Sequence, residues 1–124
     1  MGQTKRFDIA LKRVYDMACE SDGLRILVER LWPRGMSKDR ASIDHWMKET
    51  APSPELRRWY GHRPERWAEF QTRYHAELDA NAEAVRALQR LCEAGPVTFV
   101  FAARDTERNS ASALKRYLLG DRAD

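Results

Sequence analysis

The sequence contains little cysteine and glycine, and its histidines are few and scattered. Two cysteines in 124 residues, Cys19 and Cys92, cannot form the disulfide framework of a small secreted domain. The six glycines include no dinucleotide-binding or P-loop pattern. His45, His62 and His75 show no zinc-ligand spacing with one another or with the cysteines. We therefore expect no metal and no cofactor.

Long hydrophobic runs are also missing. No apolar stretch approaches the ~18 residues needed to cross a bilayer, and the first residues lack the apolar region of a secretory signal. We therefore expect a cytoplasmic protein without membrane association. With 43% hydrophobic and 33% charged residues, the chain is typical of a globular protein, and its length predicts a single domain over residues 1–124.

Charge of neither sign dominates. The 22 basic and 19 acidic residues are interleaved and leave a net charge of +3. A nucleic-acid-binding protein usually concentrates its cations on one face. The composition therefore permits a nucleic-acid partner without requiring one, and it leaves the oligomeric state open.

Strand patterns alternate with helical patterns along the chain. Strands are predicted at residues 7–15, 24–31 and 97–103, and helices at residues 54–60, 64–79 and 81–94. Ser53 would cap the helix at 54–60, and Asp105 or Thr106 would cap a last helix. Residues 36–50 fit either a helix or a short strand. In the helix at 64–79, apolar residues at helical spacing predict one buried face: Trp67, Phe70, Tyr74 and Leu78. This order predicts an α/β fold with a small, mainly parallel sheet flanked by helices.

Charged and aromatic residues gather where the strand at 24–31 ends. Glu29, Arg30, Trp32 and Arg34 follow its apolar run. Ligands of α/β proteins bind at the carboxyl ends of strands. If this strand and the one at 97–103 are parallel neighbours, these residues face the start of the last helix and Asn109. We therefore expect an anion-binding site at that edge.

A second group, around residues 57–62, combines arginine, tryptophan and histidine. Arg57 and Trp59 could stack on a planar ligand, or form a packed lid over a small core. Taken together, the candidate acid–base residues are Glu29, His62 and Asp105, and the candidate anion-binding residues are Arg30, Trp32, Arg34, Arg57, Trp59 and Asn109.

The segment from Cys19 to Arg25 has the cysteine–five–arginine spacing of cysteine phosphatases. In those enzymes the loop follows a strand and opens a helix, so that backbone amides and the arginine surround a phosphate. Here the arginine opens a predicted strand instead. We interpret the spacing as coincidental.

Several longer motifs resemble one known family. They are Leu27-Val-Glu-Arg-Leu-Trp-Pro-Arg-Gly35, Ile43-Asp-x-Trp46-x-Lys48-Glu49, Ala51-Pro-Ser-Pro-Glu-Leu-Arg57-x-Trp59-Tyr60-x-His62, Arg66-Trp67-x-x-Phe70-x-x-Arg73-Tyr74 and Ala102-Ala-x-Asp105. In this order, over about residues 8–119, they resemble the YeaO-like branch of domain of unknown function 488 (DUF488). The resemblance implies a compact bacterial α/β protein and carries no established activity. Two positions depart from the family pattern: Glu29 replaces the usual Asp, and Ser110 stands where His usually follows Asn109. If that histidine transfers protons in its relatives, this chain lacks the group.

Two functions from different classes fit these observations. The first is an anion-binding pocket of an enzyme that acts on a phosphorylated or nucleotide-like substrate, because acids and cations converge at strand ends. The alternative is a non-catalytic regulatory module that binds nucleic acid or protein, because no nucleophile, metal set or cofactor loop is identifiable.

Overall fold

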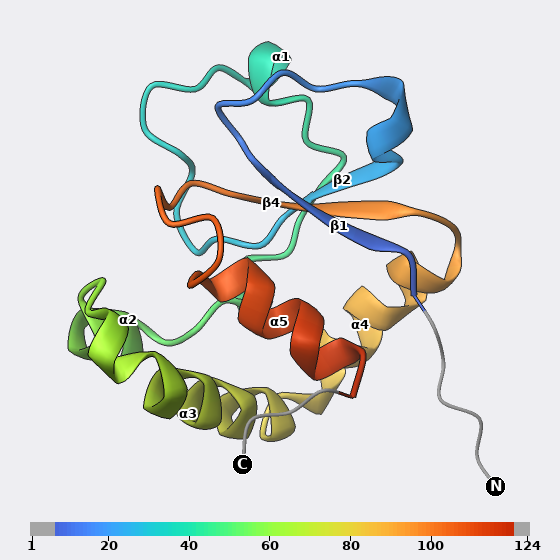
Figure 1. The fold of residues 1–124 in the computed structure, drawn as a ribbon. Helices are drawn as coiled ribbons and strands as arrows, with labels where there is room; N and C mark the ends of the chain where they lie inside the picture. Colours follow the sequence, from blue (N-terminus) through green and yellow to red (C-terminus); the bar gives the residue numbers. More distant parts are fainter. Residues whose placement is uncertain (1–6, 121–124) are drawn as a thin grey trace, which may run out of the picture.

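The computed structural model describes residues 7–120 and contains a four-stranded parallel sheet with the order β1-β4-β2-β3 (Figure 1). The strands are β1 (Ile9–Arg13), β2 (Leu24–Leu27), β3 (His45–Trp46) and β4 (Val97–Phe101). Residues of β4 are buried throughout, as expected for the central strand of a covered parallel sheet. The predicted α/β class is confirmed.

The strands β2 and β4 are parallel neighbours, as the sequence predicted. Leu24 pairs with Val97 and Leu27 with Val100, and the Val28 amide continues the ladder by donating to the Val100 carbonyl. The carboxyl ends of both strands therefore lie at one edge of the sheet. Each strand is shorter than predicted: β2 and β4 begin at the predicted residues but end earlier, and beyond β4 the Ala102 amide donates to the Glu29 carboxylate while the Ala102 and Ala103 carbonyls accept from the Arg13 side chain.

Eight helical segments complete the described chain. Four are α-helices of seven residues or more: α2 (Pro54–Tyr60), α3 (Trp67–Asp79), α4 (Ala82–Glu93) and α5 (Ser110–Leu118). A one-turn helix α1 (Lys38–Ala41) and 3-10 turns η1 (Glu20–Asp22), η2 (Lys48–Thr50) and η3 (Pro64–Arg66) lie in the connections. The region at 36–50, which fitted helix or strand, contains both, since α1, β3 and η2 follow one another there.

The residue that caps α2 is the predicted one, but the residue that caps α5 is not. Ser53 caps α2 as predicted, and its hydroxyl accepts from the Leu56 amide. The predicted cap of the last helix is wrong. Neither Asp105 nor Thr106 caps it; Asn109 does, with its side chain accepting from the Ser112 amide at 2.9 Å. The carboxylate of Asp105 binds amides of the preceding turn instead.

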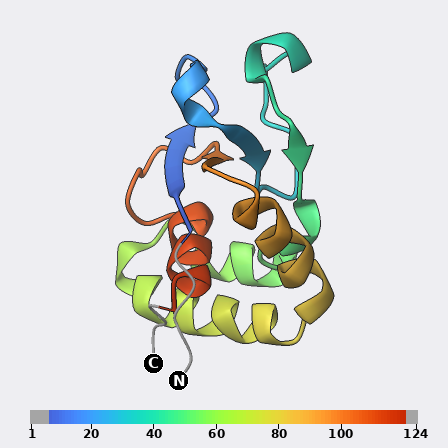
Figure 2. The ribbon, with the colours of Figure 1, turned by 90° about the vertical axis from the view of Figure 1, so that its right-hand side faces the viewer.

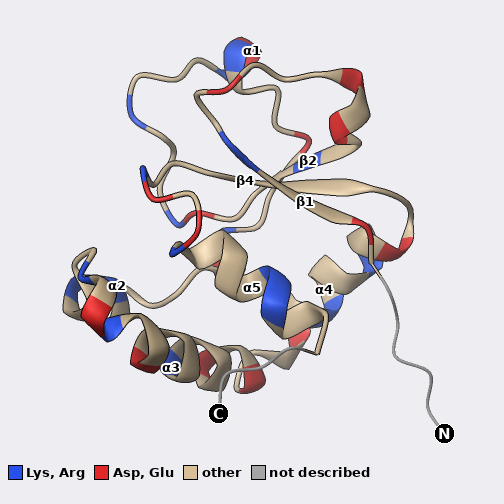
Figure 3. Cartoon of the chain, in the orientation of Figure 1, with Lys and Arg blue, Asp and Glu red and all other residues tan. Residues whose placement is uncertain are grey.

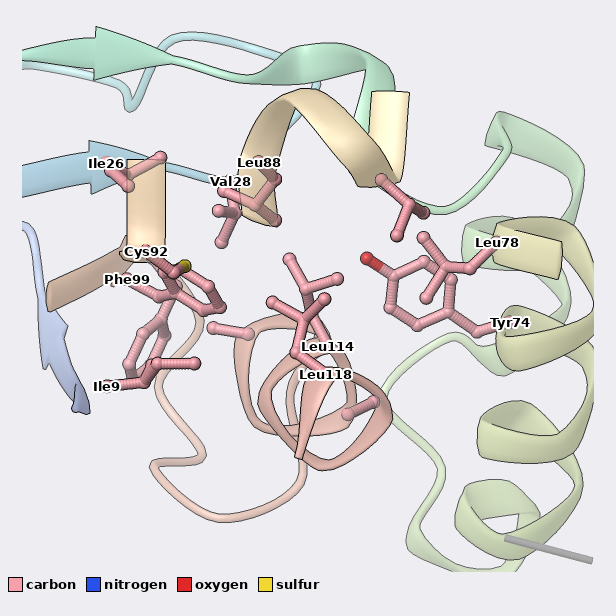
Figure 4. Packing of buried hydrophobic residues seen from close by; sticks show 14 of the residues in the cluster. Ile9, Ile26, Val28, Tyr74, Leu78, Leu88, Cys92, Phe99, Leu114 and Leu118 are labelled. Atoms are coloured by element: carbon pink, nitrogen blue, oxygen red, sulfur yellow. The ribbon is translucent and has the colours of Figure 1, made fainter. Parts of the chain in front are cut away.

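The larger α-helices lie on one side of the sheet, with α4 and α5 next to it and α3 below them (Figures 1 and 2). The core between these layers contains alternate sheet residues such as Ile9, Ile26 and Phe99, packed with Leu88 and Leu114 from the helices (Figure 4). On α3, the predicted face is confirmed for Phe70, Tyr74 and Leu78, which are buried, whereas Trp67 is half-buried at the edge of this core.

The opposite face of the sheet carries a smaller core. Val14, Leu27 and Val100 pack there with two residues of the long β2–β3 connection, Met36 and Ala41. This connection and α1 therefore cover the second face in place of a full helical layer. None of the helices in the part of the chain that the structure describes is long and apolar enough to cross a membrane.

Candidate functional site

A concave cavity of about 480 Å³ lies at the carboxyl ends of β2 and β4. Three segments form its wall: the residues after β2, helix α2 with the turn that follows it, and the start of α5. Its lining residues are Glu29, Arg30, Leu31, Pro54, Arg57, Arg58, Tyr60, His62, Phe70, Arg108, Asn109 and Ser110. The expected convergence of the β2 end with the last helix is therefore present. The volume lies within the range of small-molecule sites.

Glu29 joins the ends of the two central strands. It follows β2, and its Oε2 accepts from the Ala102 amide, just beyond β4, at 3.1 Å. Burial raises the pKa of this carboxyl; the Ala102 hydrogen bond and the nearby charges of Arg57 and His62 offset only part of the effect. Its Oε1 has no hydrogen-bond partner within residues 7–120. Glu29 thus combines a structural role with a free acceptor at the cavity wall.

Arg30 has donors committed to the backbone. Its Nη2 donates to the Ala51 carbonyl at 3.2 Å and its Nε to the Pro52 carbonyl at 3.4 Å. These bonds hold the segment that leads into α2. Arg30 lines the cavity as predicted, but most of its directed hydrogen bonding stabilises the wall.

The end of α2 supplies the basic side of the cavity. Arg57, Arg58 and Tyr60 lie on its last turns. Gly61 then takes φ 52° and His62 φ 56°, two consecutive left-handed residues that reverse the chain. Only glycine adopts this conformation without strain, so the turn holds His62 in an uncommon backbone geometry at the cavity. Both arginines lie in the last turn of α2.

Tyr60 is 7% exposed and lines this cavity and a second one beside it. Its hydroxyl has no hydrogen-bond partner among the described residues. Burial raises the pKa of Tyr60, with a further contribution from Asp105, so the hydroxyl remains a hydrogen-bond donor at neutral pH.

The residues before α5 form the opposite wall. Arg108, Asn109 and Ser110 line the first cavity, and Arg108 also lines the second, of about 460 Å³, whose other residues are Tyr60, His62, Ala102, Ala103, Arg104 and Asp105. The Arg108 Nε is buried without a hydrogen-bond partner. The nearest acidic atom of its ion pair, Asp105 Oδ2, is 3.6 Å away. The Ser110 amide, in the first turn of α5, has no partner within the described chain.

Asp105 lines only the second cavity. Its Oδ1 accepts from the amides of Arg108 and Glu107, both at 2.9 Å, and these hydrogen bonds lower the pKa of Asp105. The carboxylate shapes the turn before α5. This use weakens the case for Asp105 as an acid–base group.

Three predicted ligand-binding residues lie outside the cavity lining. Arg34 is exposed, and its carbonyl accepts from the Tyr15 hydroxyl. Trp32 packs with the smaller core and donates to the Met36 carbonyl at 2.6 Å. Trp59 contacts two cations of its own chain, with the Arg73 guanidinium 4.4 Å from its ring centroid. We expected Arg34 to share one pocket with Arg30 and the start of the last helix, with Trp32 and Trp59 near its wall; the lining of this cavity includes Arg30 but none of these three.

Arg58, Tyr60, Arg108 and Ser110 were not among the predicted site residues. A signal for Tyr60 was available, since residues three apart share a helix face and Arg57 is three positions before it. No comparable signal exists for Arg108, whose position depends on the β4–α5 loop.

The Cys19–Arg25 segment is a separate structural unit. Asp22 lies between these residues and accepts from the Cys19 amide at 3.1 Å and from Arg25 Nη1 at 2.7 Å. Arg25 is buried and donates its remaining hydrogen bonds to the carbonyls of Ala41 and Ser42. The guanidinium is therefore unavailable to a phosphate, which agrees with the interpretation of this spacing as coincidental.

Comparison with known proteins decides the family. Residues 8–124 match a family model described as "Inactive DUF488-N3 subclade". The chain belongs to the DUF488 family. It is 40% identical over 111 residues to the uncharacterized protein YeaO of Escherichia coli, covering 90% of this chain and 96% of YeaO. It is 43% identical over 112 residues to the uncharacterized protein Rv3073c of Mycobacterium tuberculosis, covering 90% of this chain and 94% of that protein.

The predicted YeaO-like DUF488 membership is thereby confirmed. No solved structure gives a significant match to this chain. Within the DUF488 chain, Ser110 lies at the cavity wall, at the position where the sequence resemblance leads us to expect histidine.

Proposed function

We propose that this DUF488 protein is a non-catalytic module whose cavity binds one small anionic ligand. The observation that carries the proposal is the Arg108 guanidinium in a wall shared by two cavities: its side chain is 41% exposed, and its Nε makes no hydrogen bond and only a 3.6 Å ion pair with Asp105. Buried donors are almost always satisfied. An anion bound at this wall would satisfy the Nε and the Tyr60 hydroxyl together.

The charges around the cavity support an anion. Arg57, Arg58 and Arg108 line it with His62, and the first turn of α5 adds an unpaired amide. Helix N-termini and arginine guanidinium groups are the usual donors to bound phosphate and carboxylate groups. A small ligand fits this concave shape better than an extended nucleic acid. Basic and acidic residues are also interleaved over the rest of the fold (Figure 3).

Binding without turnover is favoured over the enzyme reading for two reasons. The matching subclade is described as inactive. In addition, two of the three acid–base candidates serve local structure: Glu29 accepts from the Ala102 amide, and Asp105 accepts from two amides of its own turn. Ser110 replaces a group that could otherwise transfer protons.

The test is calorimetric titration of inorganic phosphate at constant ionic strength. A charge-assisted hydrogen bond contributes ~1.5–3 kcal/mol, so Arg108→Ala should weaken binding by at least about tenfold. Arg108→Lys keeps the positive charge but lacks the planar guanidinium that can donate two parallel hydrogen bonds, so it should recover only part of the lost affinity. Arg86→Ala is the matched control, because Arg86 is exposed on α4 and lies outside the cavity.

Affinity that is the same in wild type and Arg108→Ala, with circular dichroism showing both folded, would refute the anion site. Chemical change of a bound phosphate ester, detected by phosphorus NMR over hours and dependent on Glu29, would instead support the enzyme reading.

A further inference from the structure

We propose that the ligand is a sugar phosphate, with its phosphate at the Arg108 wall and a hydroxyl group donating to Glu29. This inference rests on the proposed anion site and names the class of molecule that fills it. The first observation is size. At ~30 Å³ per water molecule in the liquid, a cavity of about 480 Å³ has room for far more than a phosphate ion.

The second observation is the chemical contrast across the cavity. One wall presents donors: the Arg108 Nε, the Tyr60 hydroxyl and the Ser110 amide, which have no hydrogen-bond partner among residues 7–120. The Glu29 carboxyl contributes an acceptor oxygen at another part of the lining. A second anionic group beside Glu29 would be repelled, so the ligand must present a neutral donor there.

A hydroxyl group satisfies this requirement best. An ionised carboxylate accepts hydrogen bonds only, and a hydroxyl donates without adding charge. A ligand ammonium group could also donate, but Arg57 lines the same cavity as Glu29 and would repel a further cation. The ligand therefore carries an anionic end and a hydroxylated end.

The wall between these ends is apolar. Phe70 and Tyr60 pack with ring centroids 4.7 Å apart, and Leu31 and Pro54 lie along the same cavity. Most ligand pockets combine such a surface with a few directed polar groups. The carbon–hydrogen face of a sugar ring can pack on it while the hydroxyl groups and the phosphate reach the polar ends.

The experiment compares three probes on the folded full-length chain: inorganic phosphate, ribose 5-phosphate and pentyl phosphate. The two esters have the same number of carbon atoms and differ in their hydroxyl groups. Ribose 5-phosphate should bind the wild type at least about tenfold more tightly than pentyl phosphate, since a hydrogen bond to a charged group is made only by the sugar.

The Glu29→Ala variant should reduce that ratio towards one. Glu29→Gln removes the charge but keeps an acceptor, so it should tighten both esters and preserve part of the ratio. Arg86→Ala should leave the ratio unchanged. The wild-type ratio is informative even where a Glu29 variant does not fold.

The outcomes separate the two proposals. If none of the three probes binds, the anion site itself is refuted. If phosphate binds and the two esters bind equally, the anion site stands and the sugar phosphate is refuted. A single-stranded oligonucleotide could also bind more tightly than ribose 5-phosphate and lose this affinity in Arg108→Ala. That result would overturn the sugar phosphate in favour of a polymeric ligand.

Discussion

Replacing Asp22 by asparagine tests the physical account of the Cys19–Arg25 segment. Asp22 is 6% exposed and accepts from Lys12 Nζ at 2.8 Å and from Arg25 Nη1 at 2.7 Å. Arg25 is only 4% exposed, so the variant leaves a buried guanidinium without its negative partner. Removing one member of a buried ion pair costs ~3–5 kcal/mol.

The loss should be visible in urea unfolding at pH 7. With a slope of roughly 1–3 kcal/mol per molar urea, Asp22→Asn should lower the midpoint by at least about 1 M. Asp16→Asn is the matched control, because Asp16 is exposed. A cycle that adds Lys12→Met should show a coupling of ~1–3 kcal/mol.

The pH dependence gives an independent check. Burial alone would raise the pKa of Asp22, but hydrogen bonds from Lys12, from the Cys19 amide and thiol and from Arg25 outweigh it and lower the pKa below the ordinary value of 3.8. The unfolded state therefore binds the proton more readily. The contribution is complete above about pH 4 and is lost as the pH falls through the folded-state pKa. A midpoint shift below 0.5 M at pH 7 would refute the reasoning. So would a wild-type protein that loses no more stability than Asp22→Asn when the pH is lowered.

Three further changes test other parts of the fold. Glu29→Gln should stabilise the protein at pH 7 by about 1 kcal/mol and make its stability less dependent on pH above 4.5. The reason is that the pKa of Glu29 is raised in the folded state, so ionisation weakens the folded state as the pH rises. Thermal unfolding from pH 4 to 8 measures this. Phe70→Ala should cost ~3–5 kcal/mol in urea unfolding, since Phe70 is 2% exposed; an unchanged midpoint would exclude it from the core. Gly23→Ala should cost more than ~2 kcal/mol, because its Cβ would lie 2.2 Å from the Pro96 carbonyl oxygen at φ +65°; Gly35→Ala, with φ +76° and open space, separates strain from collision.

The sequence alone was sufficient for the order and type of the main elements. Periodicity and capping residues located the strands around β2 and β4 and the start of α2 at Ser53. These are local properties, since side-chain alternation and an N-cap hydroxyl act within a few residues. Parallel pairing of β2 with β4 then followed from topology, and it placed Glu29 beside the last helix correctly.

Tertiary structure alone decided which charged side chains share a cavity. Arg34 has the same residue type as three lining arginines of α2 and the β4–α5 loop, and Trp59 is aromatic like Tyr60 and Phe70, yet neither Arg34 nor Trp59 lines the cavity. Arg108 and Tyr60 meet only because the β4–α5 loop ends at Asn109 rather than at Asp105. Local patterns determine the helices and strands, whereas the packing of distant segments determines which charged and polar side chains line the same cavity.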